Sequence, residues 1–122
     1  MKILGIDDNA DINALLETVL IASGHEYTSV TDGREAVKLI QQNKYDILLL
    51  DLAMPEFSGH DVLAALRKEK LFDKQKIVIL TASSITDKEI DKILKDGVIG
   101  CIKKPLDIDL LVEKLEQIQA GK

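Results

Sequence analysis

The sequence predicts an α/β fold, in which one domain is built on a five-stranded parallel sheet with helices on both faces. Short apolar segments alternate with helical patterns five times along the 122 residues. The segment at 47–50 is an unbroken run of four aliphatic residues, which is typical of a strand buried on both faces of a parallel sheet. Alternation of this kind implies right-handed crossovers that place helices on both sides of the sheet.

The predicted strands are the apolar segments at 3–6, 27–30, 47–50, 77–80 and 99–102. Each is followed by apolar residues three and four positions apart, which indicate an amphipathic helix. The helices are expected at about 10–23, from 33 onward, at 59–69, at 86–95 and after 107. Asp7-Asp8-Asn9 supplies N-cap residues for the first helix and Asp107 for the last, while Gly24 and Gly97 are stop signals.

The helices carry apolar faces that we expect to point inward. In the first helix this face consists of Ile12, Leu15, Leu16, Val19 and Leu20. In the last helix it consists of Leu110, Leu111, Leu115 and Ile118.

Composition excludes several function classes. The formal net charge of −5 argues against nucleic acid as the main ligand, because phosphate binding needs clustered basic residues. Cys101 is the only cysteine, so no internal disulfide forms and a reducing compartment is expected. The N-terminus does not resemble a signal peptide, and no apolar run approaches the ~20 residues of a membrane span. We therefore expect a cytoplasmic protein, with one domain over 1–122 and no fused effector domain.

Polar residues follow four of the predicted strands at their carboxyl ends, where open α/β sheets hold their chemistry. They are Asp7, Asp8, Asp51, Thr81 and Lys104. Clustered carboxylates repel one another, so such a site should hold a cation or have a raised pKa. Oxygen ligands alone favour Mg²⁺, with Mn²⁺ as an alternative ion. A lysine and a threonine hydroxyl suit a phosphoryl group.

Each motif alone also has a simpler structural interpretation: a helix cap, a strand end, a solvated lysine pair or a turn. His25 and His60 are expected at the surface or in loops, and Cys101 as a small core residue. The joint pattern, however, resembles the receiver domains of two-component response regulators, of the single-domain chemotaxis type. The matching residues are Asp7-Asp8, Asp51 with Met54-Pro55 and Gly59, Thr81-Ala82-Ser83 and Lys104-Pro105.

The resemblance implies a flavodoxin-like three-layer sandwich with strand order 2-1-3-4-5, and Asp51 as phosphoacceptor. Asp8, Asp51 and the backbone carbonyl of Ala53 would hold Mg²⁺, with Asp7 binding mainly through water. Lys104 would contact the phosphoryl group, and Thr81 would hydrogen-bond it. Lys103 is the competing lysine, but in the family the lysine directly precedes the proline, often across a cis bond.

The partners implied by the resemblance are a histidine kinase or phosphotransfer protein as donor and a separate effector protein. The effector is expected on the face formed by the fourth helix, the fifth strand and the fifth helix, with no nucleic acid bound directly. Phosphoryl transfer and autodephosphorylation would be self-catalysed, without an independent substrate. The alternatives are a binding-only pseudo-receiver, an FMN-binding flavodoxin-like protein, and a phosphatase with an aspartate nucleophile.

The chain departs from the family pattern at Cys101, where an aromatic residue is common. We therefore expect the output signal to run mainly through the loop after Thr81. Ala53 and Ser83, each two residues after a site residue, are small. We expect neither side chain to shield an acyl phosphate from water.

Overall fold

The computed structural model describes residues 1–54, 56–82 and 84–121, and it confirms the predicted fold class. Five parallel strands form one sheet in the order β2-β1-β3-β4-β5. The strands are β1 (Lys2–Ile6), β2 (Glu26–Val30), β3 (Ile47–Asp51), β4 (Ile77–Thr81) and β5 (Gly100–Lys103). Their predicted positions are therefore correct to within one residue at each end, and the site residues Asp51 and Thr81 complete β3 and β4.

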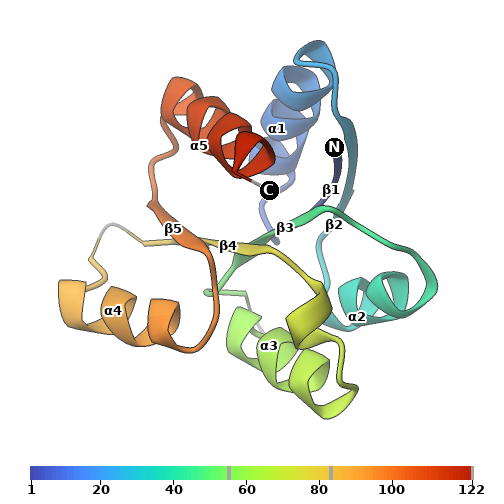
Figure 1. Ribbon diagram of the computed structural model, residues 1–122, viewed down its shortest axis with the longest axis vertical. Helices are drawn as coiled ribbons and strands as arrows, with labels where there is room; N and C mark the ends of the chain where they lie inside the picture. The colour runs from blue at the N-terminus through green and yellow to red at the C-terminus, as the bar shows by residue number, and fades with distance from the viewer. Residues whose placement is uncertain (55, 83, 122) are drawn as a thin grey trace.

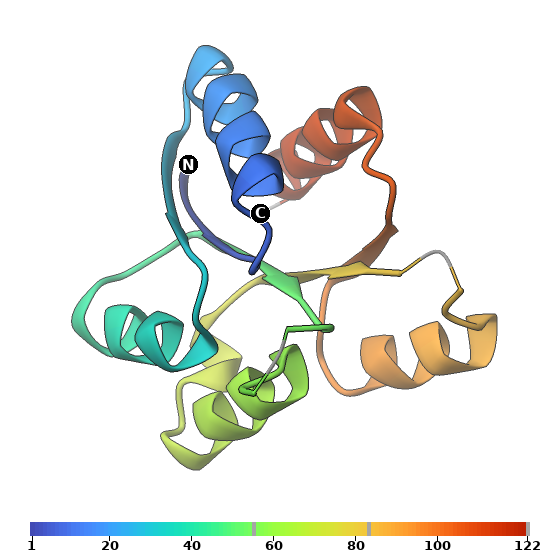
Figure 2. The same cartoon turned by 180° about the vertical axis from the view of Figure 1, so that it is seen from behind.

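Helices cover both faces of the sheet, so the molecule has three layers (Figures 1 and 2). One face carries α1 (Ala10–Ala22) and α5 (Ile108–Ala120), as Figure 1 shows. The opposite face carries α2 (Gly33–Gln42), α3 (Gly59–Lys68) and α4 (Asp87–Lys95). A short 3-10 helix, η1 (Phe72–Lys74), precedes β4 and was not predicted.

The predicted helix caps are confirmed by hydrogen bonds. The side chain of Asn9 accepts from two amides at the start of α1, and that of Asp107 accepts from one amide, the N–H of Leu110, at the start of α5. Thr86 is the N-cap of α4 rather than its first helical residue. Gly24 and Gly97 have φ of +90° and +106°, a backbone conformation that glycine adopts at little cost after a helix.

Two hydrophobic clusters fill the spaces between sheet and helices, because alternate residues of each strand point to opposite faces. On the face of α1 and α5 the strands contribute Ile3, Ile47, Leu49, Val78 and Leu80. On the face of α2 and α3 they contribute Leu4, Ile6, Leu48, Leu50, Ile77 and Ile79. Every residue of β3 and β4 is buried, as expected for the central strands of a doubly covered parallel sheet.

Four side chains differ from the prediction. Leu15 and Leu110 are 45% and 60% exposed, because the apolar face of each helix is wider than the part that meets the sheet. His25 lies in the loop between α1 and β2, one of the two predicted locations, but it is buried, and its Nδ1 lies 2.8 Å from the N-terminal nitrogen. Cys101 is half-buried at the edge of a core cluster, because β5 is an edge strand.

None of the helices in the described ranges is both long and apolar enough to cross a membrane.

Candidate functional site

The carboxyl ends of β1 and β3 bring an acidic cluster together at one edge of the sheet. Asp7 directly follows β1, Asp8 is next to it, and Asp51 is the last residue of β3. One carboxylate oxygen from each of the three lies within 4.8 Å of those of the other two. Asp7 and Asp51 are buried, whereas Asp8 is exposed. The cluster therefore has two carboxylates anchored in the protein and one that faces solvent.

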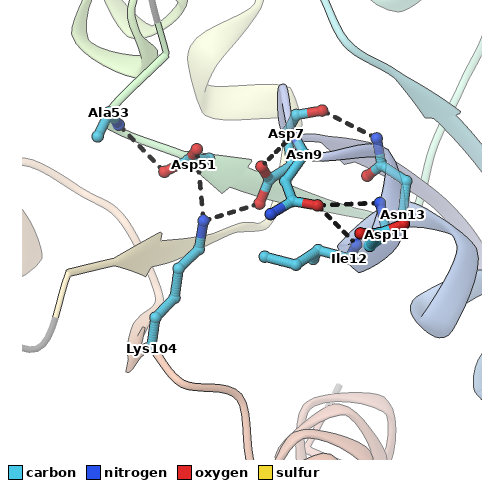
Figure 3. Close-up of polar contacts among 8 residues, drawn as sticks. All are labelled: Asp7, Asn9, Asp11, Ile12, Asn13, Asp51, Ala53 and Lys104. Atoms are coloured by element: carbon cyan, nitrogen blue, oxygen red, sulfur yellow. Dashed lines mark hydrogen bonds and ion pairs between the residues drawn. The ribbon is translucent and has the colours of Figure 1, made fainter.

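Asp7 is held from three sides, as Figure 3 shows. Its Oδ1 accepts a hydrogen bond from the backbone N–H of Asn9 at 2.9 Å, and its Oδ2 accepts one from Nζ of Lys104 at 3.0 Å. Its backbone carbonyl accepts a third from Nδ2 of Asn13 at 2.8 Å. With both carboxylate oxygens engaged, Asp7 has little freedom to reorient toward a ligand.

Asp51 is 2% exposed and lies beside the same lysine (Figure 3). Its Oδ1 accepts from the backbone N–H of Ala53 at 3.1 Å, and its Oδ2 lies 3.5 Å from Nζ of Lys104. Burial raises the pKa of the Asp51 carboxyl; the Ala53 N–H opposes this shift and the negative charge of Asp7 adds to it. A bound cation or a proton would therefore relieve an unfavourable charge here.

Lys104 extends from the segment after β5 to the acidic cluster. Partial burial would lower the pKa of its ammonium group, but the hydrogen bond and charge of Asp7, followed by those of Asp51, outweigh burial and raise the pKa. The group is therefore a stable cation at neutral pH. Its neighbour Lys103 is exposed, and the peptide bond from Lys104 to Pro105 is cis.

Thr81 ends β4 beside the lysine. Its side chain is buried, with the residue 5% exposed. The backbone N–H of Lys104 donates to the carbonyl of Thr81 at 2.7 Å, which ties the ends of β4 and β5 together. The structure thus brings Asp7, Asp8, Asp51, Thr81 and Lys104 to one edge of the sheet, as the strand-end argument predicted.

The remaining predicted positions lie around this cluster. Ala53 is exposed in the segment after β3. Pro55 and Ser83, which belong to the predicted turn and to the predicted unshielded path for water, lie outside the described residues. Burial raises the pKa of the Cys101 thiol, against an opposing charge from Lys114.

Sequence reasoning missed two residues that shape the site. Asn13 is buried on the inner face of α1, and a polar residue in phase with apolar Leu16 and Leu20 was the available signal. Gly59 was noted as the start of a predicted helix and as a residue that matches the family, but not for its close approach to β3. A Cβ atom there would lie 2.4 Å from the backbone oxygen of Asp51, so only glycine lets α3 start this close to β3.

The donor set fits a hard divalent cation. Three carboxylates converge, one of them exposed, and no histidine or cysteine belongs to the described cluster. Carboxylate oxygens with room for water are the ligands that Mg²⁺ prefers in proteins. The ammonium group of Lys104 lies beside these carboxylates. There it can bind the anionic part of a ligand that also contacts the cation.

Comparisons with known proteins agree with this arrangement. The chemotaxis protein CheY of Pseudomonas aeruginosa is 30% identical over 119 residues, which are 97% of this chain and 95% of that protein. The crystal structure of the response regulator TrrA from Thermotoga maritima in complex with Mg²⁺–BeF superposes with a TM-score of 0.79 at 30% identity. The superposition covers 96% of this chain and 97% of that one.

Longer relatives match as well. The transcriptional regulatory protein TcrA of Mycobacterium tuberculosis is 31% identical over 97% of this chain, but the match spans only 46% of TcrA. The chain thus spans about half the length of that relative. The family model described as "Response regulator receiver domain" matches residues 3–116. With this match over nearly the whole chain, and the acidic cluster and lysine at the expected strand ends, the chain belongs to the response regulator receiver domain family.

Proposed function

We propose that the chain carries a two-component signal by accepting a phosphoryl group on Asp51 from a histidine kinase or a phosphotransfer protein. The observation that carries the proposal is the contact of one ammonium group, that of Lys104, with the carboxylates of both Asp7 and Asp51. This geometry supports a site that holds a metal ion and a phosphoryl group side by side. Family membership supports the same signalling role.

In the proposed transfer, a carboxylate oxygen of Asp51 attacks the phosphorus of a phosphohistidine. The new bond is O–P, the N–P bond breaks, and its electron pair returns to the imidazole nitrogen. Positioning and charge neutralisation dominate such a reaction. Lys104 would neutralise part of the phosphoryl charge, and the buried surroundings of Asp51 would keep bulk water away from its inner side.

Mg²⁺ would supply further charge neutralisation when bound, with Mn²⁺ as the alternative ion. We propose Asp8, Asp51 and the Ala53 carbonyl as its direct protein ligands. Asp7 would bind through water, since both of its carboxylate oxygens already accept hydrogen bonds from the protein. The exposure of Asp8 supports its role as the ligand through which the ion enters.

The phosphoryl group would switch the domain through new hydrogen bonds. Phosphorylation adds roughly two negative charges beside Thr81 and Lys104. Charge-assisted hydrogen bonds contribute ~1.5–3 kcal/mol each, while a complete two-state switch needs ~5.5 kcal/mol of differential binding. Two such bonds just reach this range, so we propose a population shift that the partner completes.

We propose the face formed by α4, β5 and α5 for a separate effector protein. A groove of about 450 Å³ between β5 and α5 is lined by Cys101, Lys103, Leu110 and Lys114 among others. Leu110, Leu94 and Ile99 are 60%, 40% and 42% exposed, which supports apolar contacts on this face. With Cys101 at the common aromatic position, the loop after Thr81 would carry the signal to α4.

We also propose that the acyl phosphate is hydrolysed by the domain itself, without an independent substrate. The Ala53 side chain is small and exposed, and it offers no shield to an approaching water molecule. Ala53→Gly should leave the lifetime of the phosphoryl group nearly unchanged. A large acceleration of dephosphorylation would show that Ala53 does shield the phosphorus atom. The single-domain organisation and the cytoplasmic address remain predictions.

Intact mass spectrometry tests the proposal. The protein is incubated with a small acyl-phosphate donor, with and without Mg²⁺, and compared with the Asp51→Asn variant. A single Mg²⁺-dependent phosphoryl adduct that is absent in the variant is expected. No adduct on wild type, together with no response to beryllofluoride as a stable phosphoryl mimic, would instead support the binding-only pseudo-receiver.

A further inference from the structure

Two polar atoms behind the acidic cluster are buried without a hydrogen-bond partner in the described part of the chain. They are Oδ1 of Asn13, which is an acceptor, and the phenol oxygen of Tyr27, which carries a proton to donate. Buried polar groups are almost always paired with protein or with ordered water. Each of these two atoms therefore needs a partner, such as an ordered water molecule.

The side chain of Tyr27 crosses β1 close to Asp7. Tyr27 on β2 pairs with Ile3 on β1, and Ile3, Gly5 and Asp7 alternate onto the same face. The phenol oxygen lies 1.8 Å from the position that a Cβ atom on Gly5 would take. The side chain thus crosses from β2 over Gly5, two residues before Asp7, and needs a glycine there.

Asn13 approaches the same place from α1. It is 5% exposed, and its Nδ2 donates to the backbone carbonyl of Asp7 at 2.8 Å. Tyr27 packs against the cluster that contains Leu16 and Leu20, the next inward residues of α1. Tyr27 and Asn13 therefore lie on the same face of the sheet, the face that α1 covers.

The electrostatic surroundings of the Tyr27 phenol include two carboxylates that flank the first part of α1. Burial raises the pKa of the Tyr27 phenol, and the negative charges of Asp7 and then Glu17 raise it further. Asp7 precedes α1, and Glu17 lies one turn beyond Asn13.

We propose that Asn13 and Tyr27 form a positioning pair behind the acidic cluster, joined by one buried water molecule. The water would accept the phenol proton of Tyr27 and donate to Oδ1 of Asn13. The orientation of the Asn13 amide would then be fixed, with Nδ2 held on the Asp7 carbonyl. The pair would thereby set the turn that presents Asp7 and Asp8 to Mg²⁺, an effect that rests on the metal site of the proposed function.

Residues that orient metal ligands from behind typically change metal affinity 10–100-fold when they are replaced. Asn13 acts on the backbone of Asp7 rather than on its carboxylate, so Asn13→Leu should weaken Mg²⁺ binding by roughly tenfold, the low end of that range. Tyr27→Phe removes only the hydroxyl and should weaken binding less. The double variant should bind no more weakly than Asn13→Leu alone, because both changes break one network.

Calorimetric Mg²⁺ titration of wild type, both single variants and the double variant tests the pair, with denaturant unfolding measured in parallel. Tyr45→Phe is the matched control, since Tyr45 is a buried tyrosine in the cluster on the opposite face. It should leave Mg²⁺ affinity unchanged. A high-resolution structure of metal-free wild type should contain the bridging water, and that of Tyr27→Phe should lack it. This comparison keeps the test valid should Asn13→Leu not fold.

The outcomes separate the two proposals. Wild type that binds no Mg²⁺ would overturn the proposed function. If wild type binds Mg²⁺ and the variants bind it equally well, with only their stability lowered, the positioning role is wrong and the metal site stands. Additive losses in the double variant, or a metal-free wild-type structure with no water between the two side chains, would overturn the link between Asn13 and Tyr27.

Discussion

Nζ of Lys104 donates a hydrogen bond to Oδ2 of Asp7 at 3.0 Å, although the two residues are 97 positions apart in the chain. The same nitrogen lies 3.5 Å from Asp51 (Figure 3). In the absence of a metal ion, one lysine thus offsets the charge of two buried carboxylates. If Asp51 is a Mg²⁺ ligand as proposed, the ammonium group of Lys104 competes with the ion for the Asp51 carboxylate.

Replacing Lys104 should show its effect on the stability of the metal-free protein separately from its effect on Mg²⁺ binding. Lys104→Met leaves two buried carboxylates without their cation, so the free energy of unfolding of the metal-free protein should fall by roughly 3 kcal/mol. Mg²⁺ should bind more tightly to the variant, because its competitor is gone. Denaturant unfolding and calorimetric Mg²⁺ titration measure these changes.

The adjacent lysine provides the control for this experiment. Lys103 is exposed, and Lys103→Met should change stability by less than about 0.5 kcal/mol and leave Mg²⁺ affinity unchanged. Equal effects at both positions would show that net charge, rather than the contact with Asp7 and Asp51, is responsible.

The raised pKa of Asp51 predicts a pH-dependent stability. Because this pKa is higher in the folded than in the unfolded state, the contribution of Asp51 to stability is fully present below its unfolded pKa of about 4. It is lost as the pH rises through the folded pKa. Asp51→Asn cannot ionise, so at pH 7 it should be more stable than wild type by on the order of 1 kcal/mol.

Urea unfolding of both metal-free proteins between pH 3 and pH 8 measures this difference, which should vanish toward low pH. Asp91→Asn, an exposed substitution on α4, is the control and should show no such trend. A stability gain in Asp51→Asn that persists unchanged at low pH would rule out ionisation as its cause.

The close approach of α3 to β3 predicts a severe effect of Gly59→Ala. The added Cβ would lie 2.4 Å from the oxygen of Asp51 and 2.7 Å from Cα of Leu52, and both are backbone atoms that cannot move aside independently. We expect a loss of at least ~2 kcal/mol of stability and weaker Mg²⁺ binding, because the end of β3 must shift.

Gly24→Ala is the matched comparison for Gly59→Ala. At Gly24 φ is +90° and a Cβ would meet no atom within 4 Å, so only the backbone conformation is penalised, by ~1–2 kcal/mol. Mg²⁺ affinity should be unaffected there. Unchanged Mg²⁺ affinity in Gly59→Ala would mean that α3 moves and leaves Asp51 in place.

Thr81→Val should uncouple modification from the switch. Valine keeps the shape of this buried side chain but cannot donate a hydrogen bond to a phosphoryl oxygen. Asp51 should still form the adduct, while the population of the switched state falls about tenfold or more, the equivalent of one charge-assisted bond. NMR shifts in α4 on addition of beryllofluoride would report this loss.

The exposed Thr18→Val serves as control, and a full response of α4 in Thr81→Val would exclude Thr81 from the signal path.

The elements of this fold were predictable because their signals are local. Asn9, Thr86 and Asp107 each lie within three residues of the amides they cap, and the aliphatic run before Asp51 identifies the central strand. Boundaries were off by a residue at several ends, because the hydrogen-bond ladder with neighbouring strands, rather than local preference, decides where an element stops. The 3-10 helix over Phe72–Lys74 had no periodic signal and was missed.

The site was predictable only as a set of residue types at strand ends. From the sequence alone, Asp7, Asp51 and Lys104 could be assigned to one edge of a parallel sheet, because crossovers return every strand in the same direction. The resemblance singled out Lys104 over Lys103, but the contact of its ammonium group with both carboxylates depends on side-chain paths between residues far apart in the chain.

The sequence by itself determined the order of elements, the central strand and the residues at its end, since periodicity and capping act over a few residues. Only the tertiary structure decided that His25 is buried, that Leu15 and Leu110 remain exposed, and that Asn13 turns its amide to the carbonyl of Asp7. These outcomes depend on how each helix is rotated against the sheet. That rotation is set by packing across the whole domain, which no local stretch of sequence encodes.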